Sequence, residues 1–372
     1  MRLRNFDADG FLREHWQKRP LLIRDAWQAW ENPLEPDELA GLACEDGVES
    51  RLVVQRASGP VVEHGPLDAE RFAGLDGEVW TLLVQAVDQQ VPAVAALLEA
   101  FRFVPEWRID DVMVSYAVDQ GGVGAHYDQY DVFLVQGLGR RRWRVGARCD
   151  AATAMVPGQA LHVIDGFVAE DEWVLEPGDM LYLPPGFGHQ GVALGDDCMT
   201  YSVGFRAPSR EELVRGWAER VAEGLGEDDR YADPDLRPQT HACEIAPAAL
   251  DRLHAMATEA LADKAAFARW LGEHVSQPKY PEIDWRPEQA TGEAEVRRRL
   301  RAGGRLERNP ASRFAFVRDG GRATLFVDGE AYGCSVELAE RLCGGLAVDG
   351  DDAAVGLVTV LVNRGALAFG ED

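Results

Sequence analysis

The sequence predicts an α+β protein with an antiparallel β-barrel or sandwich first, a helical segment second and a winged-helix-like segment last. Two observations predict this order. Residues 1–207 consist mainly of short apolar runs separated by glycine and proline, which is typical of antiparallel strands. After Pro208 the apolar residues recur at helical intervals instead. The chain has 372 residues, of which 46% are hydrophobic, so it is long enough to build several buried cores.

The barrel is expected to contain short strands that form two facing sheets. We predict strands at residues 50–55, 111–118, 131–136, 141–145, 172–175, 180–183, 189–193 and 200–205. Gly137-Leu138-Gly139 and Pro177-Gly178-Asp179 are predicted to be hairpin turns, because glycine and proline provide the backbone conformations that turns need. Apolar residues at helical spacing also predict helices over Pro36–Cys44 and Glu78–Phe101.

Residues 208–277 are predicted to be helical. The segment Ser209-Arg210-Glu211-Glu212 is a capping-box pattern, which predicts where the first helix begins. Further amphipathic helices are expected over Pro247–Leu261 and Lys264–Val275. We interpret this segment as an oligomerisation or packing module rather than as a site.

Residues 278–372 begin with a proline-containing linker, Pro278–Gln289, which shows no apolar periodicity. A helix over Glu293–Arg301 and a hairpin over Arg313–Val327, turning at Asp319-Gly320-Gly321, are expected next. Two more helices and the short terminal segment Ala366–Phe369 complete a winged-helix-like order. The helix Glu293–Arg301 and the residues after it carry a run of arginines: Arg297, Arg298, Arg299, Arg301, Arg305 and Arg308. This run fits a nucleic-acid contact or, since glutamates interleave with it, a solvated or protein-docking surface.

The charge of the chain excludes some partners. The formal net charge is -25, from 63 acidic and 38 basic residues, so the summed field repels nucleic acid and favours a basic protein partner. Solubility alone would also explain an acidic surface. The six cysteines are far apart and form no CxxC pair, which predicts neither a disulfide framework nor a thiolate zinc site. The charged start of the chain shows no signal peptide or membrane span, so we expect a cytoplasmic protein.

The strongest candidate for chemistry is the pair His126 and Asp128, which follows a glycine-rich bend. Two residues apart on an extended strand, the imidazole and the carboxylate would share one face and could reach one metal ion. The pair alone is also consistent with an ordinary surface histidine beside a capping or salt-bridged aspartate.

A second segment, Glu176–Gln190, supplies a third ligand, His189. The spacing G-x5-P-x-G-x2-H from Gly178 to His189 is that of the second metal motif of cupin barrels. Two histidines and one carboxylate form the facial triad that leaves positions open on iron for an oxidisable 2-oxo acid and for O2. A closed structural zinc site would need a fourth ligand. The other six histidines have no partner at ligand spacing and stay unassigned.

Arg141 is the candidate for binding the distal carboxylate of 2-oxoglutarate. Alternation along the expected strand 141–145 places Arg141 on the same face as Trp143 and Val145, and that apolar face should point inward. A guanidinium in the barrel can bind a carboxylate through two hydrogen bonds. Ser115, on the neighbouring strand 111–118, could add a hydroxyl. The alternative is that Arg140, Arg141, Arg142 and Arg144 are all solvated.

These residues resemble a known family. HYDQYDVFLVQGLGRRRWRVG together with EPGDMLYLPPGFGHQG is similar to the JmjC-domain ribosomal oxygenases. The similarity extends to HWQKRPLLIRDAW, PDELAGLA, ESRLV, WRIDDVMVSYAV and YSVGFRAPSREEL, which resemble the bacterial arginine-specific branch. It covers essentially the whole chain, although residues after about 270 match in organisation more than in motif.

The resemblance implies a JmjC oxygenase domain over residues 1–207, a helical dimerisation domain over 208–277 and a linker with a winged-helix domain over 278–372. It implies Fe(II) bound by His126, Asp128 and His189, with 2-oxoglutarate and O2 as co-substrates and Arg141 as the basic residue for 2-oxoglutarate. The implied reaction is hydroxylation of an arginine side chain on the basic large-subunit ribosomal protein L-sixteen. Eukaryotic relatives carry lysine at the Arg141 position and hydroxylate histidine, so Arg141 favours the bacterial branch.

Four residues near the motif are expected to contact the substrate arginine: Asp119, Gln120, Tyr130 and Asp131. They would supply hydrogen-bond acceptors and an aromatic surface, but turn or salt-bridge roles are equally consistent with their positions. Two other classes of function remain open. A non-oxygenase cupin enzyme would also use the triad, and a transcription regulator with a ligand-sensing barrel would also carry a winged helix.

Overall fold

The computed structural model describes residues 1–57, 59–345, 347–348 and 350–370. It divides into two compact units. The first contains residues 1–207, 279–284 and 309–311, and the second contains residues 208–278, 285–308 and 312–372. Among the described residues, no helix is both long enough and apolar enough to span a membrane.

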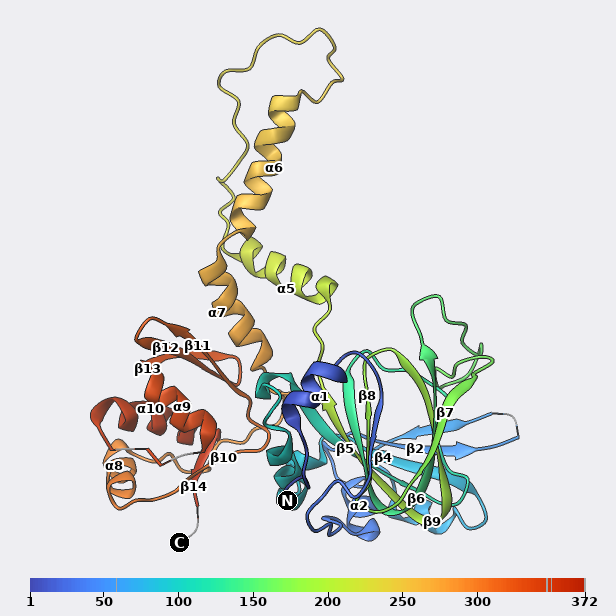
Figure 1. The fold of residues 1–372 in the computed structure, drawn as a ribbon. Coiled ribbons are helices and arrows are strands. Elements are labelled where there is room, and N and C mark those ends of the chain that lie inside the picture. Colours follow the sequence, from blue (N-terminus) through green and yellow to red (C-terminus); the bar gives the residue numbers. More distant parts are fainter. Residues whose placement is uncertain (58, 346, 349, 371–372) are drawn as a thin grey trace. The chain divides into compact units, whose positions relative to one another are not determined.

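The first unit is built on one antiparallel sheet of nine strands, which curls into a barrel (Figure 1). Its strands are β1 (Leu21–Ile23), β2 (Ser50–Gln55), β3 (Val61–His64), β4 (Val79–Val84), β5 (Ile109–Ala117), β6 (Asp131–Arg148), β7 (Ala169–Leu175), β8 (Met180–Leu183) and β9 (Phe187–Phe205). Their order is β1-β8-β6-β9-β5-β4-β2-β3, and β7 pairs with β6 beside β8. The predicted antiparallel β-architecture is therefore confirmed.

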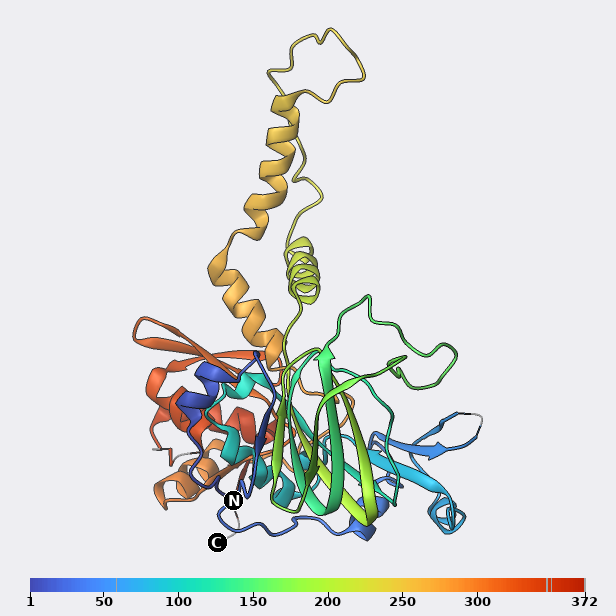
Figure 2. The same cartoon turned by 45° about the vertical axis from the view of Figure 1, so that its right-hand side comes forward.

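Two strands are much longer than the sequence predicted. The expected strands 131–136 and 141–145 join into β6, and the expected strands 189–193 and 200–205 join into β9. β6 and β9 pair side by side from Asp131 opposite Phe205 to Arg148 opposite Phe187 (Figure 2). The hairpin predicted at Gly137-Leu138-Gly139 is wrong. The register shifts there instead, so the glycines bend one continuous strand as a β-bulge does.

The hairpin predicted at Pro177-Gly178-Asp179 is also wrong. β7 and β8 both pair with β6, β7 with residues 141–146 and β8 with residues 132–135. The segment between them therefore steps along one edge of β6 and does not reverse the chain. Gly178 has a φ of +89°, and its amide donates to the carbonyl of Gln136 at 2.9 Å. Glycine is needed here because other residues rarely adopt that backbone conformation.

The helix predicted over Glu78–Phe101 is wrong in its first part. Residues Val79–Val84 form β4, which pairs with β2 and β5. Only the second part is helical, as η1 (Val87–Gln89), α4 (Pro92–Ala95) and η2 (Ala96–Phe101). The error arose because Leu82 and Leu83 face opposite sides of the sheet and both are buried, so the apolar run lacks the alternation that marks a strand. The remaining short helices are α1 (Ala8–Glu14), α2 (Pro36–Leu42), α3 (Ala69–Ala73) and η3 (Glu106–Arg108), and α2 was predicted.

The barrel strands are buried on both faces, which determines where a site can lie. Phe133 and Val135 of β6 pack outward against the helices in a core that also holds Phe11 and Phe101. Their neighbours Val132 and Leu134 face the barrel interior, in a second, smaller core. The helices therefore seal the outer face, and polar side chains placed at inward positions are enclosed by the barrel.

The second unit contains helices and two small sheets. Its elements are α5 (Arg210–Glu223), α6 (Pro247–Leu261), α7 (Lys264–Val275), α8 (Glu293–Arg301), β10 (Leu306–Arg308), β11 (Phe314–Asp319), β12 (Arg322–Val327), β13 (Glu330–Ser335), α9 (Val336–Gly344), α10 (Asp352–Asn363) and β14 (Leu367–Phe369). The bounds of α6, α7 and α8 agree with the prediction, and the capping box of Ser209 and Glu212 begins α5 as expected. The hairpin of β11 and β12 is confirmed, and β13 adds a third strand to it.

Three of the four arginines of α8 form ion pairs with acids of their own unit. Arg297 forms an ion pair with Asp352, and Arg298 and Arg299 lie 2.5 and 2.8 Å from the carboxylate of Glu295. These contacts favour a solvated helix face over a nucleic-acid contact.

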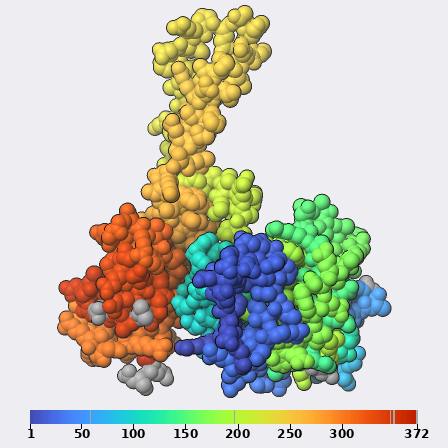
Figure 3. Space-filling model, in the orientation of Figure 1, coloured from blue at the N-terminus to red at the C-terminus, as the bar shows by residue number. Residues whose placement is uncertain are grey.

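Helix α6 differs from its neighbours because none of its residues is buried. Leu250 is 59% exposed, and Leu253 and Met256 are 44% and 37% exposed. Figure 3 shows the side chains of the segment that contains this helix, in yellow to orange, exposed on the visible face. By contrast, α5 and α7 bury Trp217 and Trp270 against each other, with the ring centroids 5.8 Å apart.

Candidate metal centre

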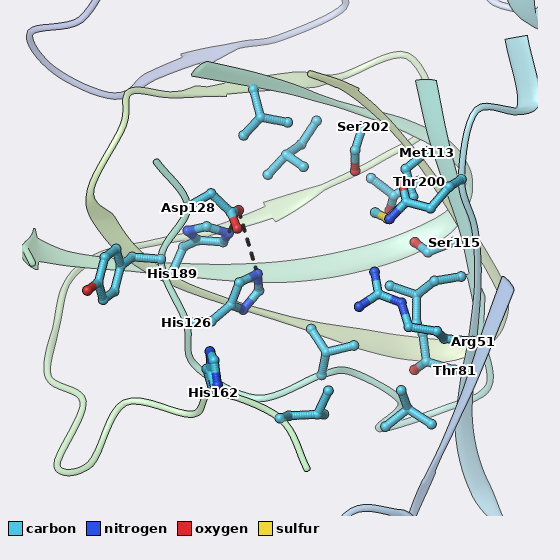
Figure 4. A pocket seen from close by; sticks show the side chains of 18 of the residues that line it. Arg51, Thr81, Met113, Ser115, His126, Asp128, His162, His189, Thr200 and Ser202 are labelled. Carbon is cyan, nitrogen blue, oxygen red and sulfur yellow. Dashed lines mark ion pairs between the residues drawn. The ribbon is translucent and has the colours of Figure 1, made fainter. Parts of the chain in front are cut away.

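Three of the predicted ligands meet at one point. His126 and Asp128 lie in the segment before β6, and His189 lies in β9. Oδ2 of Asp128 is 3.8 Å from Nε2 of His126 and 3.6 Å from Nε2 of His189. One ligand atom from each side chain falls within 4.8 Å of the other two, so one ion could contact all three. Figure 4 shows the three side chains converging from two separate segments.

The two histidines are joined through their backbones. The amide of His126 donates to the carbonyl of His189 at 2.9 Å, and the amide of His189 donates to the carbonyl of His126 at 2.8 Å. This pairing is an isolated bridge and not part of a longer strand, so the extended strand expected at the HxD pair is reduced to one bridged residue. A doubly hydrogen-bonded antiparallel pair holds its two Cα atoms about 5.5 Å apart. The bridge therefore sets the spacing of the two imidazoles.

Both imidazoles are oriented by backbone carbonyls. Nδ1 of His126 lies 3.1 Å from the carbonyl of Gly124, and Nδ1 of His189 lies 2.9 Å from the carbonyl of Phe187. A carbonyl oxygen only accepts, so each Nδ1 carries the proton and each Nε2 presents a lone pair to the centre. Burial, and then the neighbouring His126, lowers the pKa of His189 to about 4. His189 is consequently neutral near pH 7, which is the form that binds metal.

The triad opens into a cavity of about 580 Å³ inside the barrel. Its wall is formed by inward residues of neighbouring strands, which stand opposite one another in register. One such row is Arg51, Leu83, Ser115 and Thr200, and the next is Met113, Ser202 and Leu134. Figure 4 shows Ser115, Thr200 and Ser202 on this wall, across the cavity from the triad. A cavity of this size holds a small diacid together with one substrate side chain.

Arg141 lies where alternation along β6 predicts it. It is 5% exposed and lines the cavity together with Trp143, while Arg140 is exposed. Nε of Arg141 lies 3.5 Å from Sγ of Cys198. Its Nη2 is buried and has no hydrogen-bond partner among the described residues. Because a buried guanidinium without an acceptor is costly, this atom fits a site for an incoming carboxylate.

Ser115 also lines the cavity and is 3% exposed. Its polar neighbours Thr81, Thr200 and Ser202, and Arg51 at the start of β2, line the same cavity but were not predicted as site residues. Arg51 could have been found, because it occupies an alternate position of a strand whose bounds were predicted correctly. Thr81 could not, because the segment that contains it was predicted to be helical.

Three of the four expected substrate contacts lie elsewhere. Asp119 accepts hydrogen bonds from the amide of Gly195 at 2.7 Å and from the side chain of Gln120. Asp119 and Gln120 do not line the cavity. Asp131 is fully buried and holds Arg108, at 3.1 Å, and the hydroxyl of Tyr182, at 2.5 Å. These contacts are structural, and so the positions of Asp119, Gln120 and Asp131 do not support the substrate role.

Tyr130 is the exception among the four. It lines the cavity and is 42% exposed, so its ring is accessible from solvent and from the barrel interior.

The comparisons with known proteins agree with this geometry. Residues 96–213 match a JmjC domain family, and residues 259–368 match a ROXA-like winged-helix family. The ribosomal protein uL16 3-hydroxylase of Escherichia coli is 45% identical over 277 residues, which are 74% of this chain and 73% of that protein. The chain belongs to the JmjC ribosomal oxygenases. The JmjC and winged-helix parts of the predicted fold are thereby confirmed.

Solved structures of a ribosomal oxygenase extend the similarity to the full length. The X-ray structure of E. coli ycfD superposes with a TM-score of 0.90 at 37% identity and covers 100% of both chains. A structure of that oxygenase in complex with cobalt and 2-oxoglutarate superposes with a TM-score of 0.87 at 38% identity, over 100% of this chain and 99% of the other. A relative from Haemophilus influenzae, a probable ribosomal oxygenase, is 42% identical over 61% of this chain and 54% of its own length.

Proposed function

We propose that this ribosomal oxygenase uses Fe(II), 2-oxoglutarate and O2 to hydroxylate an arginine side chain of the large-subunit ribosomal protein uL16. The observation that carries the proposal is the combination of His126, Asp128 and His189 with Arg141 in one cavity, where Nη2 of Arg141 has no hydrogen-bond partner among the described residues. We take uL16 as the substrate because the similar E. coli protein is named as a uL16 3-hydroxylase.

The residues present fit a divalent iron. His126, Asp128 and His189 would hold it, since the chain offers two imidazole nitrogens and one carboxylate oxygen within reach of one ion. This donor set suits an open iron site better than a closed structural zinc. When bound, the iron with 2-oxoglutarate and O2 supplies the oxidising power that hydroxylation of an unactivated C–H bond requires.

The protein itself supplies position and exclusion of water. The carbonyls of Gly124 and Phe187 hold both Nε2 atoms toward the centre, so the ligands need no reorganisation on binding. Arg141 and Ser115 bind and orient the far carboxylate of 2-oxoglutarate at the inner end of the cavity. Trp143 and Leu134 form apolar walls that keep the reacting C–H bond away from bulk water.

A basic substrate fits the electrostatics of the whole chain. The net charge of -25 attracts a cationic protein over long distances and speeds its association. Tyr130, exposed at the cavity, offers a ring on which a substrate guanidinium can stack. Ribosomal proteins are made and assembled in the cytoplasm of bacteria, and we place the enzyme there.

We further propose that the helical segment 208–277 forms a homodimer. The support is the apolar face of α6, where Leu250, Leu253 and Met256 are all exposed in the single chain. An exposed apolar helix face of this kind is typical of a protein interface. The domain scheme that follows is an oxygenase domain over 1–207, a dimerisation domain over 208–277 and the winged-helix segment over 278–372.

The proposed reaction can be tested directly. Protein prepared without oxygen is incubated with Fe(II), 2-oxoglutarate and a set of peptides from ribosomal proteins, and O2 is then admitted. We expect one arginine of a uL16 peptide to gain one oxygen in the mass spectrum, with one succinate formed per oxygen transferred. If 2-oxoglutarate is not consumed with any peptide, the oxygenase function proposed here is wrong.

A further inference from the structure

Arg51 points into the catalytic cavity although no part of the proposed mechanism uses it. It lies at the second position of β2, opposite Leu83 of β4, which in turn is opposite Ser115 of β5. Residues opposite each other in a sheet project from the same face, so Arg51 and Ser115 belong to one inward row. Figure 4 shows the Arg51 side chain reaching from the wall, beside Ser115, into the cavity.

One nitrogen of the Arg51 guanidinium has no acceptor in the cavity. Its Nε is buried and has no hydrogen-bond partner among the described residues, as is also true of Nη2 of Arg141 and Oγ1 of Thr81. All three residues line the same cavity. Native proteins rarely leave buried donors unpaired, so a cluster of such donors on one wall indicates a ligand rich in acceptors.

The guanidinium of Arg51 is held in place by the side chain of Gln85. With the Gln85 amide oriented so that its nitrogen donates to Oδ2 of Asp111 at 3.2 Å, its oxygen accepts from Nη2 of Arg51 at 3.0 Å. Asp111 is fixed in turn by Lys279 at 2.8 Å and by the amide of Ala86 at 2.9 Å. One edge of the guanidinium is thus anchored through Gln85, while its Nε edge stays available.

The charges around the cavity favour an anionic ligand. Among the described residues that line it, the only carboxylate is that of Asp128, whereas Arg51 and Arg141 are both cationic. With a divalent ion at the triad, the site therefore carries an excess of positive charge that a dianion would offset. The substrate proposed for this site is itself a cation, so it cannot be the group that Arg51 attracts.

We propose that Arg51 is a second basic residue for the co-substrate and that, together with Arg141, it contacts the distal carboxylate of 2-oxoglutarate. This role rests on the proposed function. Two guanidinium groups on one carboxylate bind a dianionic 2-oxo acid strongly and give no comparable advantage to a 2-oxo acid with a single carboxylate. Arg51 thereby determines which 2-oxo acid the enzyme accepts.

The test measures binding and needs no turnover. Wild type, Arg51→Met and Arg51→Lys are loaded with Co(II) or Mn(II) without oxygen. Calorimetry then gives the dissociation constants for two ligands, 2-oxoglutarate and 2-oxopentanoate, of which the second lacks the distal carboxylate. We expect Arg51→Met to weaken the binding of 2-oxoglutarate roughly ten- to a hundredfold and that of 2-oxopentanoate by less than about threefold. Arg51→Lys should recover part of the loss, since it restores the charge without the planar fork.

Arg56→Met is the matched control. Arg56 follows the same strand, is exposed and pairs with Glu78 at 3.4 Å, so its replacement should leave both dissociation constants unchanged. Melting temperature and bound metal are measured for every variant, and Arg51→Lys keeps the test valid if Arg51→Met does not fold.

The outcomes separate this inference from the proposed function. If wild type fails to bind 2-oxoglutarate with metal present, the proposed function is wrong. If wild type binds it and both Arg51 variants bind it equally well, only the role of Arg51 is overturned. The role is overturned in the same way if the variants weaken only the binding of the uL16 peptide in the same calorimetric assay, because Arg51 would then contact the substrate protein.

Discussion

His126 and His189 exchange both of their backbone hydrogen bonds, although they lie 63 positions apart in the chain. The backbone hydrogen bonds therefore determine the positions of both histidines in the metal site. Each imidazole is fixed twice, once by this bridge and once by a carbonyl that accepts from its Nδ1. A site arranged in this way before the metal arrives loses little entropy on binding it.

Replacing a triad histidine should abolish metal binding. We expect His189→Ala to lose bound iron and all turnover of 2-oxoglutarate, because only two ligands remain. His162→Ala is the control, since His162 lines the same cavity but is not part of the triad. Metal content by elemental analysis and succinate formation test both. Retention of stoichiometric iron by His189→Ala would contradict the assignment.

Arg141→Met should raise the KM for 2-oxoglutarate by roughly a hundredfold, because the buried ion pair between Arg141 and the distal carboxylate of 2-oxoglutarate is lost. Arg141→Lys should restore part of the affinity, since an ammonium keeps the charge. Arg140→Met, one position along β6 and exposed, serves as the control and should behave as wild type. The KM is measured by succinate formation at saturating peptide. An unchanged KM in Arg141→Met would place the far carboxylate elsewhere.

Asp131 and Tyr130 are adjacent but should respond differently. Asp131→Ala removes the carboxylate that holds Arg108 and Tyr182, and we expect it to lower the free energy of unfolding by about 3–5 kcal/mol. Tyr130→Ala should leave the melting temperature nearly unchanged and raise the KM for the peptide. Thermal unfolding and peptide kinetics on the same preparations distinguish them. A stable Asp131→Ala with a raised peptide KM would restore the substrate role that its burial argues against.

The buried Asp88 predicts a pH dependence of stability. Burial raises its pKa from 3.8 to about 7, and its Oδ1 accepts from the amide of Val112 at 2.7 Å. Between pH 4 and 7 the folded protein keeps this proton while the unfolded chain releases it, so stability falls as pH rises and the loss is complete above about pH 7.

Asp88→Asn removes that loss, because the amide is neutral at every pH and can still accept from Val112. We expect it to stabilise the protein by roughly 1–3 kcal/mol at pH 8 and by much less at pH 5. Melting temperatures of wild type and variant at the two pH values measure the difference. An equal effect at both would show that the proton on Asp88 is not the cause.

The apolar face of α6 predicts the oligomeric state. Leu253→Glu places a charge among exposed apolar residues, and we expect it to convert a dimer into a monomer without changing the melting of the barrel. Asp251→Lys, a charge change at an exposed position on the opposite side of the same helix, is the control. Sedimentation velocity at micromolar concentration gives the masses. A wild type that sediments as a monomer throughout would refute the dimer.

The features that could be predicted from the sequence are those that depend on the spacing of nearby residues. The three ligands, the inward face of Arg141, the hairpin of β11 and β12 and the bounds of α6 to α8 all follow from short-range spacing. The errors arose where tertiary structure overrides local pattern. Residues 79–84 form β4 because β2 and β5 lie on either side to pair with it, and no local feature of the apolar run records those partners.

The two hairpins predicted in the barrel were wrong for a related reason. Glycine and proline show where a strand can deviate but not whether the chain turns back. Gly137 to Gly139 lie within β6, where the register shifts, and Pro177 to Asp179 lie between β7 and β8, which both pair with β6. At neither place does the chain reverse its direction. The substrate contacts stay predictions. Asp119, Gln120 and Asp131 are close to the triad in sequence, but of the four expected residues only Tyr130 lines the cavity.

The bulge in β6 changes the parity of the strand. Before it, the even positions Val132 and Leu134 face the barrel interior, and after it the odd positions Arg141, Trp143 and Val145 do. Without the extra residue, the cavity would receive Arg140 and Arg142, while Trp143 would be turned toward solvent. The irregular backbone at residues 136–140 thus determines which of the three consecutive arginines 140–142 lies inside the barrel. A one-residue deletion there should turn Arg141 toward solvent, although every residue of the site would still be present in the sequence.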